Sequence, residues 1–95
     1  MGKHESIAQF EAIRDRVIII NGVSKGYAMT GWRIGYAAAP AGILEGMLKI
    51  HQYGALCAPI MSQHAALAAL RGGEPDVLEM VESYNQRRRV IVKGL

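Results

Sequence analysis

A continuous run of β-branched residues, "RVIIINGV" at 16–23, constrains the fold of this chain more than any other stretch. Apolar runs of this length, without polar alternation, are typical of strands that are buried on both faces. The run closes at Asn21-Gly22, and a lone lysine, Lys25, follows three residues later. We therefore predict a buried strand over 16–23 with an amine just beyond its carboxyl end.

The spacing of the other apolar residues predicts a second strand and several helices. Residues 5–14 indicate a short helix or structured turn, and 32–39, closed by Pro40, indicate a strand that can pair with the first in antiparallel fashion. Three longer helices are expected, one from Pro40 to about residue 51, one over 60–72 and one over 74–95. Their predicted apolar faces are Ile43, Leu44, Met47, Leu48 and His51 in the first, Ile60, Met61, His64, Leu67 and Ala68 in the second, and Val77, Leu78, Val81, Tyr84, Ile91 and Leu95 in the third. The expected fold class is α/β, with two strands followed by three helices.

Composition places the chain among globular proteins, with 51% hydrophobic and 20% charged residues. The formal charge of +3 depends largely on the run Arg87, Arg88 and Arg89. The single cysteine, Cys57, excludes an internal disulfide, and a reducing cytoplasm is the expected compartment. We expect no membrane association, because the apolar stretches are far shorter than the ~20 residues that span a bilayer. The opening "MGKHES" matches the loose N-myristoylation pattern, which nothing nearby supports.

The predicted strands and helices are expected to form only part of a complete fold. Two strands do not make an independently stable sheet. The last helix runs to the final residue without a stop signal, and the start lacks capping residues. We therefore expect an internal fragment of a longer fold.

Lys25 and Arg33 together indicate a specific chemistry. A lysine amine at the carboxyl edge of a buried strand lies where α/β proteins place ligand groups. Partial desolvation and nearby positive charge lower the pKa of an amine, which makes it a nucleophile toward carbonyls. Arg33, eight residues later, carries the planar guanidinium that suits a phosphate. An aldehyde cofactor bearing a phosphate, such as pyridoxal phosphate, needs this pair.

The segment "SKGYAMTGWRIGYAAAP", preceded by "NGV", closely resembles the active-site segment of class I/II aminotransferases. These are pyridoxal-phosphate-dependent enzymes of fold type I, in the aspartate and aromatic amino-acid group. The pattern Ser-Lys followed by Gly-Trp-Arg-x-Gly is highly specific, and "KHESIA", "APIMSQHAALAAL" and "YNQRRRVIVKGL" extend the resemblance along the whole chain.

The resemblance implies roles for three residues. Lys25 would form the internal aldimine with pyridoxal phosphate and later shuttle a proton between the substrate's α-carbon and C4′ of the cofactor. Arg33 would hold the phosphate. The resemblance leaves open whether Ser24 binds the phosphate. The family often places its phosphate-binding hydroxyl three residues before the lysine, where this chain has Gly22. On an extended chain Ser24 would also face away from Lys25.

The resemblance also implies a domain arrangement and substrates. Residues 1–73 would be the lysine-bearing part of the large domain, and 74–95 a helix leading toward the small domain. The parent enzyme would be a homodimer that acts on amino acids and 2-oxo acids. The family's aspartate for the pyridine nitrogen, its ring-stacking aromatic residue and its substrate-binding arginine have no counterpart in the matched stretch. We therefore do not expect the isolated chain to catalyse transamination.

Two other functions are alternatives to aminotransferase activity. The chain could be a non-catalytic structural or binding module derived from that fold. The arginine run suggests nucleic-acid binding, but three successive helical residues point in different directions and no aromatic platform accompanies them. We therefore expect no nucleic-acid partner.

Several other residues receive structural interpretations. We expect Tyr27 and Trp32 to pack, His51 and His64 to be partly buried, and His4 to be solvated. Cys57 is expected to behave as a small apolar residue. No pair of histidines has the spacing of a metal site supported by acidic or thiol residues, so no metal is expected.

Overall fold

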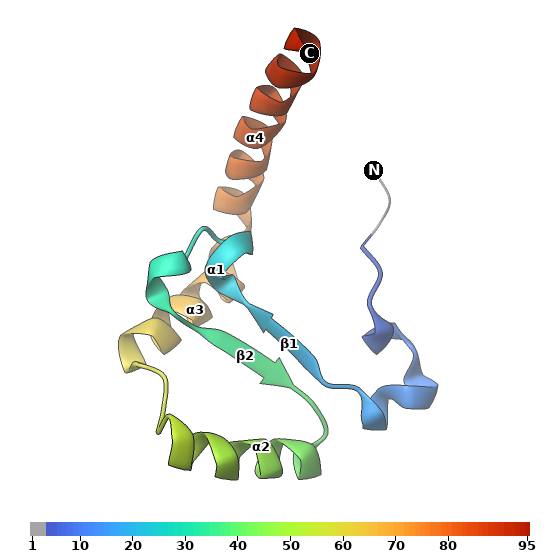
Figure 1. The fold of residues 1–95 in the computed structure, drawn as a ribbon, viewed down its shortest axis with the longest axis vertical. Coiled ribbons are helices and arrows are strands. Elements are labelled where there is room, and N and C mark those ends of the chain that lie inside the picture. Colours follow the sequence, from blue (N-terminus) through green and yellow to red (C-terminus); the bar gives the residue numbers. More distant parts are fainter. Residues whose placement is uncertain (1–3) are drawn as a thin grey trace. The chain divides into compact units, whose positions relative to one another are not determined.

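The two strands expected from the sequence form one antiparallel ladder in the computed structural model, which describes residues 4–95. β1 (Ile19–Gly22) pairs with β2 (Gly35–Ala38), and Ile20 lies opposite Ala37 (Figure 1). The α/β class and the antiparallel pairing are both confirmed. The first three residues of the myristoylation pattern lie outside the described residues.

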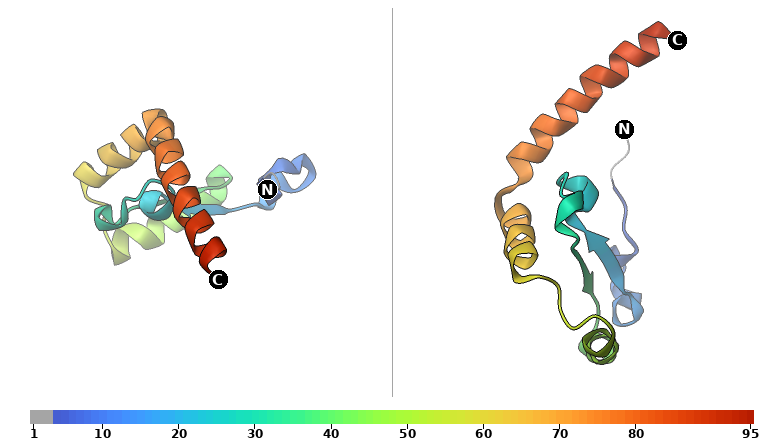
Figure 2. Two further views of the ribbon diagram at one scale, coloured as in Figure 1. Left: turned by 90° about the horizontal axis from the view of Figure 1, so that it is seen from above. Right: turned by 60° about the vertical axis from the view of Figure 1, so that its left-hand side comes forward.

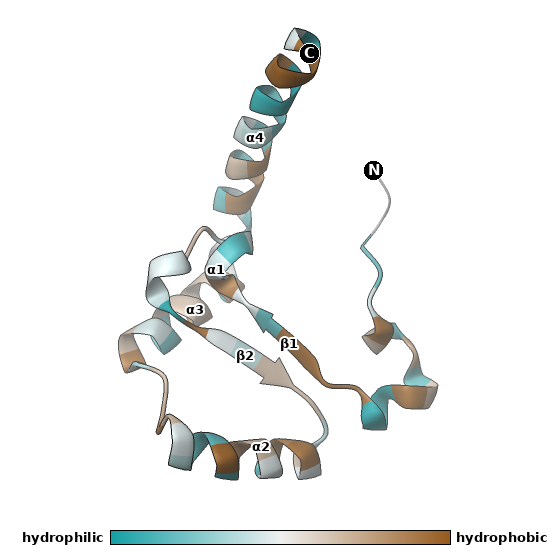
Figure 3. Cartoon of the chain, viewed as in Figure 1, coloured by the Kyte–Doolittle hydropathy of each residue, from teal (hydrophilic) through white to brown (hydrophobic). Residues whose placement is uncertain are grey.

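Both strands are shorter than predicted, and β1 is not buried on both faces. The 3-10 helix η2 (Glu11–Arg16) occupies the start of the predicted strand, and Val23 already belongs to a helical turn. Ile20 is 78% exposed, so one face of the ladder is uncovered at this position. Figure 3 shows β1 changing from hydrophobic to hydrophilic toward its carboxyl end, where Asn21 follows the isoleucines. The apolar run therefore identifies the strand but not its burial.

The contacts within the chain divide it into two units. The first comprises the described part of residues 1–22 together with 35–58, and the second comprises 23–34 and 59–95. Besides the ladder, the first unit contains η1 (Ile7–Gln9), η2 and α2 (Ala41–Gly54). The short helix or turn expected over 5–14 is thus confirmed as two 3-10 turns.

α2 begins where the sequence predicts. Pro40 is its N-cap, and the Pro40 carbonyl oxygen accepts hydrogen bonds from the backbone N–H groups of Ile43 and Leu44 at 3.0 and 3.1 Å. Proline suits this position because its missing N–H is not needed at a helix start. The helix continues to Gly54, three residues beyond the predicted stripe.

The second unit contains two long helices separated by a glycine. α3 (Ile60–Gly72) stops where the Gly72-Gly73 pair predicts, and α4 (Glu74–Gly94) begins immediately after it (Figure 2). The first turn of α4 contains Glu74 and Asp76, whose charges stabilise the positive end of the helix dipole. The short α1 (Val23–Gly26) and η3 (Thr30–Trp32) complete this unit, and they contact each other.

The buried face of α3 is not the predicted one. Ser62 and Ala66 are buried, whereas Ile60, Met61 and Leu67 of the predicted apolar face are exposed. Small side chains allow a neighbouring backbone to approach closely, so they can form the covered side of a helix even when larger residues lie opposite. The predicted partial burial of His64 is wrong for the same reason, since it lies on the exposed side.

Gly73, between α3 and α4, has no room for a larger residue. A Cβ at this position would lie 2.7 Å from the carbonyl oxygen of Ala69 and 3.2 Å from Cδ1 of Tyr27. We therefore expect Gly73→Ala to lower the free energy of unfolding by about 1–3 kcal/mol, the usual cost of overpacking. Urea denaturation followed by circular dichroism measures this change.

Gly72→Ala is the matched control for this prediction. A Cβ at Gly72 would meet nothing within 4 Å. Because alanine favours helix over glycine by up to ~1 kcal/mol, this variant is expected to be neutral or slightly stabilised. Equal destabilisation of both variants would contradict the steric explanation.

Candidate active site

The lysine lies on a single helical turn directly after β1. Val23, the first residue of α1, is only 1% exposed and anchors the turn. Its carbonyl oxygen accepts a hydrogen bond from the backbone N–H of Tyr27 at 3.1 Å. On a helical turn, successive side chains differ in direction by about 100° instead of pointing to opposite sides. The extended geometry that would turn Ser24 away from Lys25 is therefore not present.

Ser24 and Lys25 line the same cavity, which has a volume of about 510 Å³ and lies within the second unit. The rest of its wall consists of Gly26, Ala28 and Thr30 from the same segment and Val77, Met80, Val81 and Tyr84 from α4. Among the described residues, no carboxylate lines this cavity. Three of the lining residues carry hydroxyl groups. The sequence predicts Ser24 as a site residue, but it does not predict Thr30 or Tyr84.

The surroundings of Lys25 differ from the sequence-based expectation in one respect. Its side chain is exposed, so the partial desolvation expected at the end of a buried strand is not found. Within residues 4–95, the structure records no ion pair for Lys25. The amine is thus accessible from the cavity and is not held by a carboxylate.

Arg33 lies beside the cavity wall but is not part of it. One of its terminal nitrogens, Nη1, donates a hydrogen bond to the carbonyl oxygen of Thr30 at 3.1 Å, and Thr30 lines the cavity. A guanidinium carries five N–H donors, so this bond leaves most of them unused. No carboxylate pairs with Arg33 in the described part of the chain.

The backbone between the lysine and the arginine holds two left-handed residues. Ala28 has a φ of 53° and Arg33 a φ of 49°. A non-glycine residue in this region costs roughly 1–2 kcal/mol, so such angles persist only where the surroundings impose them. The two residues lie on either side of η3, and Arg33 is its C-cap.

Tyr27 packs instead of facing Lys25, as the sequence interpretation favoured. It is not among the residues that line the lysine cavity, and its ring lies close to Gly73. It borders a separate cavity of about 380 Å³ with Leu70, Arg71 and Glu74. Trp32, expected to pack as well, is 44% exposed.

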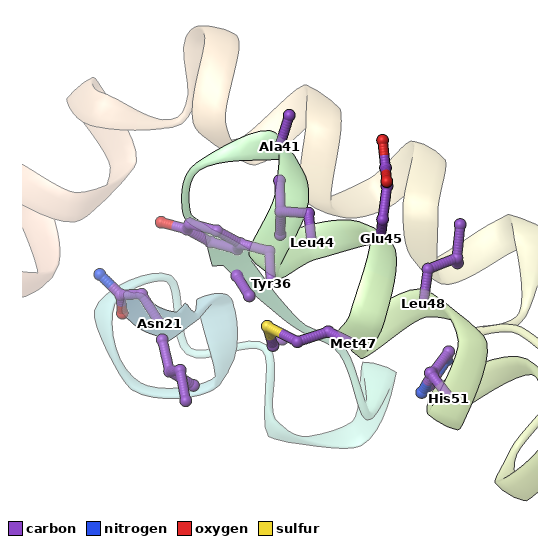
Figure 4. A pocket seen from close by; sticks show the side chains of 11 residues that line it. Asn21, Tyr36, Ala41, Leu44, Glu45, Met47, Leu48 and His51 are labelled. Atoms are coloured by element: carbon purple, nitrogen blue, oxygen red, sulfur yellow. The ribbon is translucent and has the colours of Figure 1, made fainter. Parts of the chain in front are cut away.

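The first unit has an apolar cavity of its own, of about 700 Å³, between the two strands and α2 (Figure 4). Its labelled residues are Asn21, Tyr36, Ala41, Leu44, Glu45, Met47, Leu48 and His51. His51 is exposed at this cavity, so its predicted partial burial is wrong. No described lysine or arginine lines this cavity.

The arginine run lies on an exposed part of α4. Arg88 donates from Nε and Nη2 to Oδ1 of Asn85, at 3.1 and 2.9 Å. The guanidinium of Arg87 lies 5.7 Å from the ring centroid of Tyr84.

The remaining residues assigned from the sequence are solvent-facing. Among residues 4–95, His4 is solvated as expected, and Cys57 is a free, exposed cysteine. No three histidine, cysteine or acidic side chains of that range come together as metal ligands. In the same range, no helix has the length and apolar character needed to cross a bilayer.

Known proteins similar to this chain are aminotransferases. A family model described as aminotransferase class I and II matches residues 1–95. A Bacillus subtilis protein named as an aminotransferase is 50% identical over 90 residues, which cover 95% of this chain and 23% of the relative. The aspartate aminotransferase of Pyrococcus abyssi is 44% identical and matches 98% of this chain and 24% of its own length.

Solved structures agree with the sequence matches. The aromatic aminotransferase of Pyrococcus horikoshii aligns with a TM-score of 0.84 and 41% identity, over 97% of this chain and 25% of that protein. A Methanococcus jannaschii protein, whose active site is described as similar to kynurenine aminotransferases, aligns with a TM-score of 0.85. The α/β fold expected from the resemblance, as a segment of an aminotransferase fold, is confirmed.

The matched segment is a limited part of each relative. The chain spans about a quarter of the length of the proteins it matches, while nearly all of its own residues are aligned. The family match nevertheless covers every residue from the β1 run through Lys25 and Arg33 to the end of α4. The chain therefore belongs to the class I and II aminotransferase family.

Proposed function

We propose that this chain supplies the lysine-bearing part of an aminotransferase that uses pyridoxal phosphate. The reaction would move an α-amino group from an amino acid of aspartate or aromatic type to a 2-oxo acid. One observation carries the proposal: Ser24 and Lys25 line one cavity directly after β1, in a chain that belongs to the aminotransferase family.

The cavity residues fit an aromatic aldehyde that carries an anionic group. Lys25 provides an amine, Ser24 and Thr30 provide hydroxyl groups, and Tyr84 provides an aromatic wall. An anionic ligand would meet no carboxylate among the described lining residues. A volume of about 510 Å³ also lies within the range of ~300–1,000 Å³ that is usual for small-molecule sites.

Each residue has a distinct role in this proposal. When bound, pyridoxal phosphate supplies an aldehyde for condensation with amines and a ring that withdraws electrons from the substrate's α-carbon. Nζ of Lys25 would be the amine that holds the cofactor. Once the substrate's amino group has displaced it, the free amine of Lys25 would take the proton from that α-carbon. Arg33 holds the phosphate with the N–H groups that Thr30 leaves unused. Ser24 donates its hydroxyl to the same anion.

The wider arrangement is also part of the proposal. Residues 1–73 belong to the large domain, 74–95 lead toward the small domain, and the enzyme works as a cytoplasmic homodimer. Since the chain spans about a quarter of its relatives' length, transamination is expected to need residues outside the matched segment.

Chemical trapping tests where the cofactor attaches. The chain is incubated with pyridoxal phosphate, reduced with borohydride, digested and mapped by mass spectrometry. We expect modification at Lys25 to exceed that at Lys49 and Lys93, two exposed lysines on α2 and α4. Equal modification of all three would refute the site and favour a non-catalytic module.

Ser24→Ala tests the second residue of the turn. Loss of one hydrogen bond costs about 0.5–1.5 kcal/mol, so the concentration of pyridoxal phosphate that half-saturates Lys25 should rise by roughly two- to tenfold. The same titration with pyridoxal, which lacks the phosphate, should be unaffected. A Ser24→Ala variant that weakens both ligands equally would show that Ser24 does not contact the phosphate.

A further inference from the structure

Tyr27 belongs to the lysine turn through its backbone and to the junction of α3 and α4 through its ring. Its backbone N–H donates a hydrogen bond to the carbonyl oxygen of Val23 at 3.1 Å, which closes the turn that carries Lys25. Its side chain is half-buried, and a Cβ built on Gly73, between the two helices, would lie 3.2 Å from its Cδ1. Tyr27 therefore connects two segments that are far apart in the sequence.

The lysine turn is too short to be stable by itself. α1 has only four residues, Val23–Gly26, and a first helical turn fixes several backbone angles for a single hydrogen bond. Packing of side chains at the ends of the turn must therefore maintain it. Val23, 1% exposed, supplies such packing at the start of the turn, and Tyr27 supplies it directly after the end.

Lys25 and Tyr27 face two different cavities that share part of their walls. Lys25 lines the cavity of about 510 Å³, and Tyr27 lines the one of about 380 Å³. Gly26 and Val77 line both. Displacement of the Tyr27 ring would therefore move the backbone that carries the amine.

The direction of the lysine side chain depends on this backbone. Within residues 4–95, the structure records no hydrogen bond or ion pair for the side chain of Lys25. No polar partner among these residues can therefore aim the amine into its cavity. The turn itself has to do so.

We propose that Tyr27 is a positioning residue for Lys25, because its ring, packed against Gly73, holds the lysine turn in place. The inference rests on the proposed function, since it requires that Lys25 be the amine that condenses with the aldehyde. Tyr27 itself touches no reacting atom. Without its ring, Lys25 should react like an ordinary exposed lysine such as Lys49 or Lys93.

Trapping with two aldehydes tests this role. Pyridoxal phosphate and pyridoxal are titrated separately, and modification of Lys25 is measured by mass spectrometry after borohydride reduction. We expect Tyr27→Ala to raise the half-saturating concentration of both aldehydes about three- to tenfold, because loss of positioning does not depend on the phosphate. Tyr27→Phe keeps the ring and should restore the wild-type values. Tyr53→Ala, which removes an 87% exposed tyrosine of α2 in the other unit, is the control and should have no effect.

Hydrogen exchange separates positioning of the turn from stability of the whole unit. In Tyr27→Ala, the backbone N–H groups of residues 27 and 28, which bond to Val23 and Lys25, should exchange faster, while those of α3 keep their wild-type rates. Equal acceleration throughout α3 would show that Tyr27 supports the entire unit, and the inference would be wrong. If Tyr27→Ala loses helix content in circular dichroism, Tyr27→Leu, which retains more apolar volume, takes its place in both experiments.

A double-mutant cycle tests whether Gly73 is the relevant contact. A methyl group at Gly73 would crowd the Tyr27 ring, so Gly73→Ala alone should also raise the half-saturating concentration of pyridoxal at Lys25. Once Tyr27→Ala has removed the ring, Gly73→Ala should have no further effect on this concentration. Additive effects of the two changes would show that the ring does not act through Gly73.

The outcomes distinguish this inference from the function on which it rests. If Lys25 is preferentially modified and Tyr27→Ala behaves as wild type, the inference is wrong and the proposed function stands. If Tyr27→Ala weakens pyridoxal phosphate but not pyridoxal, Tyr27 acts on the phosphate and the inference is wrong. If Lys25 is not preferred over Lys49 and Lys93 in the unmodified chain, the proposed function fails and the inference fails with it.

Discussion

A Lys25→Ala variant is expected to lose the trapped cofactor at the turn after β1 essentially completely. Lys25 is the only amine-bearing side chain among the residues that line the described cavity, and hydroxyl groups cannot form the carbon–nitrogen bond that borohydride reduces. Peptide mapping after reduction measures the loss directly. The visible absorbance of bound pyridoxal phosphate provides an independent measurement.

Two further variants make this result specific. Lys49→Ala removes an exposed lysine of α2, in the other unit, and should leave the trapped cofactor unchanged. Lys25→Arg keeps the positive charge but has no primary amine, so it should lose the signal as Lys25→Ala does. A stoichiometric signal that survives in Lys25→Ala would show that the cofactor attaches elsewhere.

The second large effect is expected from Arg33→Ala. Hydrogen bonds to a charged group contribute about 1.5–3 kcal/mol, so the affinity for pyridoxal phosphate should fall roughly 10- to 150-fold. Pyridoxal, which has no phosphate, should bind with unchanged affinity. Titration of Lys25 with the two aldehydes, followed by reduction and mass spectrometry, measures both values.

The backbone conformation at this position makes alanine a suitable replacement. Arg33 has a φ of 49°, and alanine carries the same Cβ, so the left-handed strain is similar in both proteins. Arg14→Ala, an exposed arginine of η2 in the other unit, is the matched control and should have no effect. Equal weakening of pyridoxal and pyridoxal phosphate by Arg33→Ala would show that Arg33 supports the fold and does not bind the phosphate.

The elements that the sequence predicts correctly all depend on local signals. α2 follows Pro40, α3 stops at Gly72-Gly73, and α4 begins with acidic residues in its first turn. Prolines, glycines and charges at helix ends act within one turn of the backbone, so a short window of sequence contains the needed information. The predicted antiparallel pairing also follows from two strands that are near in sequence.

The sequence predicts the burial of side chains less well, because burial depends on which surfaces of the fold cover each other. The isoleucine run predicts a strand that is buried on both faces. In the structure, Ile20 is 78% exposed in a ladder of two strands. In α3 the covered residues are the small Ser62 and Ala66, not the larger apolar residues on the predicted face. Periodicity shows which residues share a helix face, but it does not say which face meets a neighbour.

The order of residues is enough to predict the α/β class, to give the spacing of Lys25 and Arg33, and to supply the motif that resembles the aminotransferase family. The three-dimensional fold was needed to show that Ser24 shares a cavity with Lys25, that Arg33 donates a hydrogen bond to the carbonyl oxygen of Thr30, and that Tyr84 of α4 lines the same cavity. Lys25 and Tyr84 are far apart in the chain, and they line one cavity only because the fold brings α4 near the turn after β1. Such long-range packing is set by the sum of many weak contacts, which no short stretch of sequence reveals.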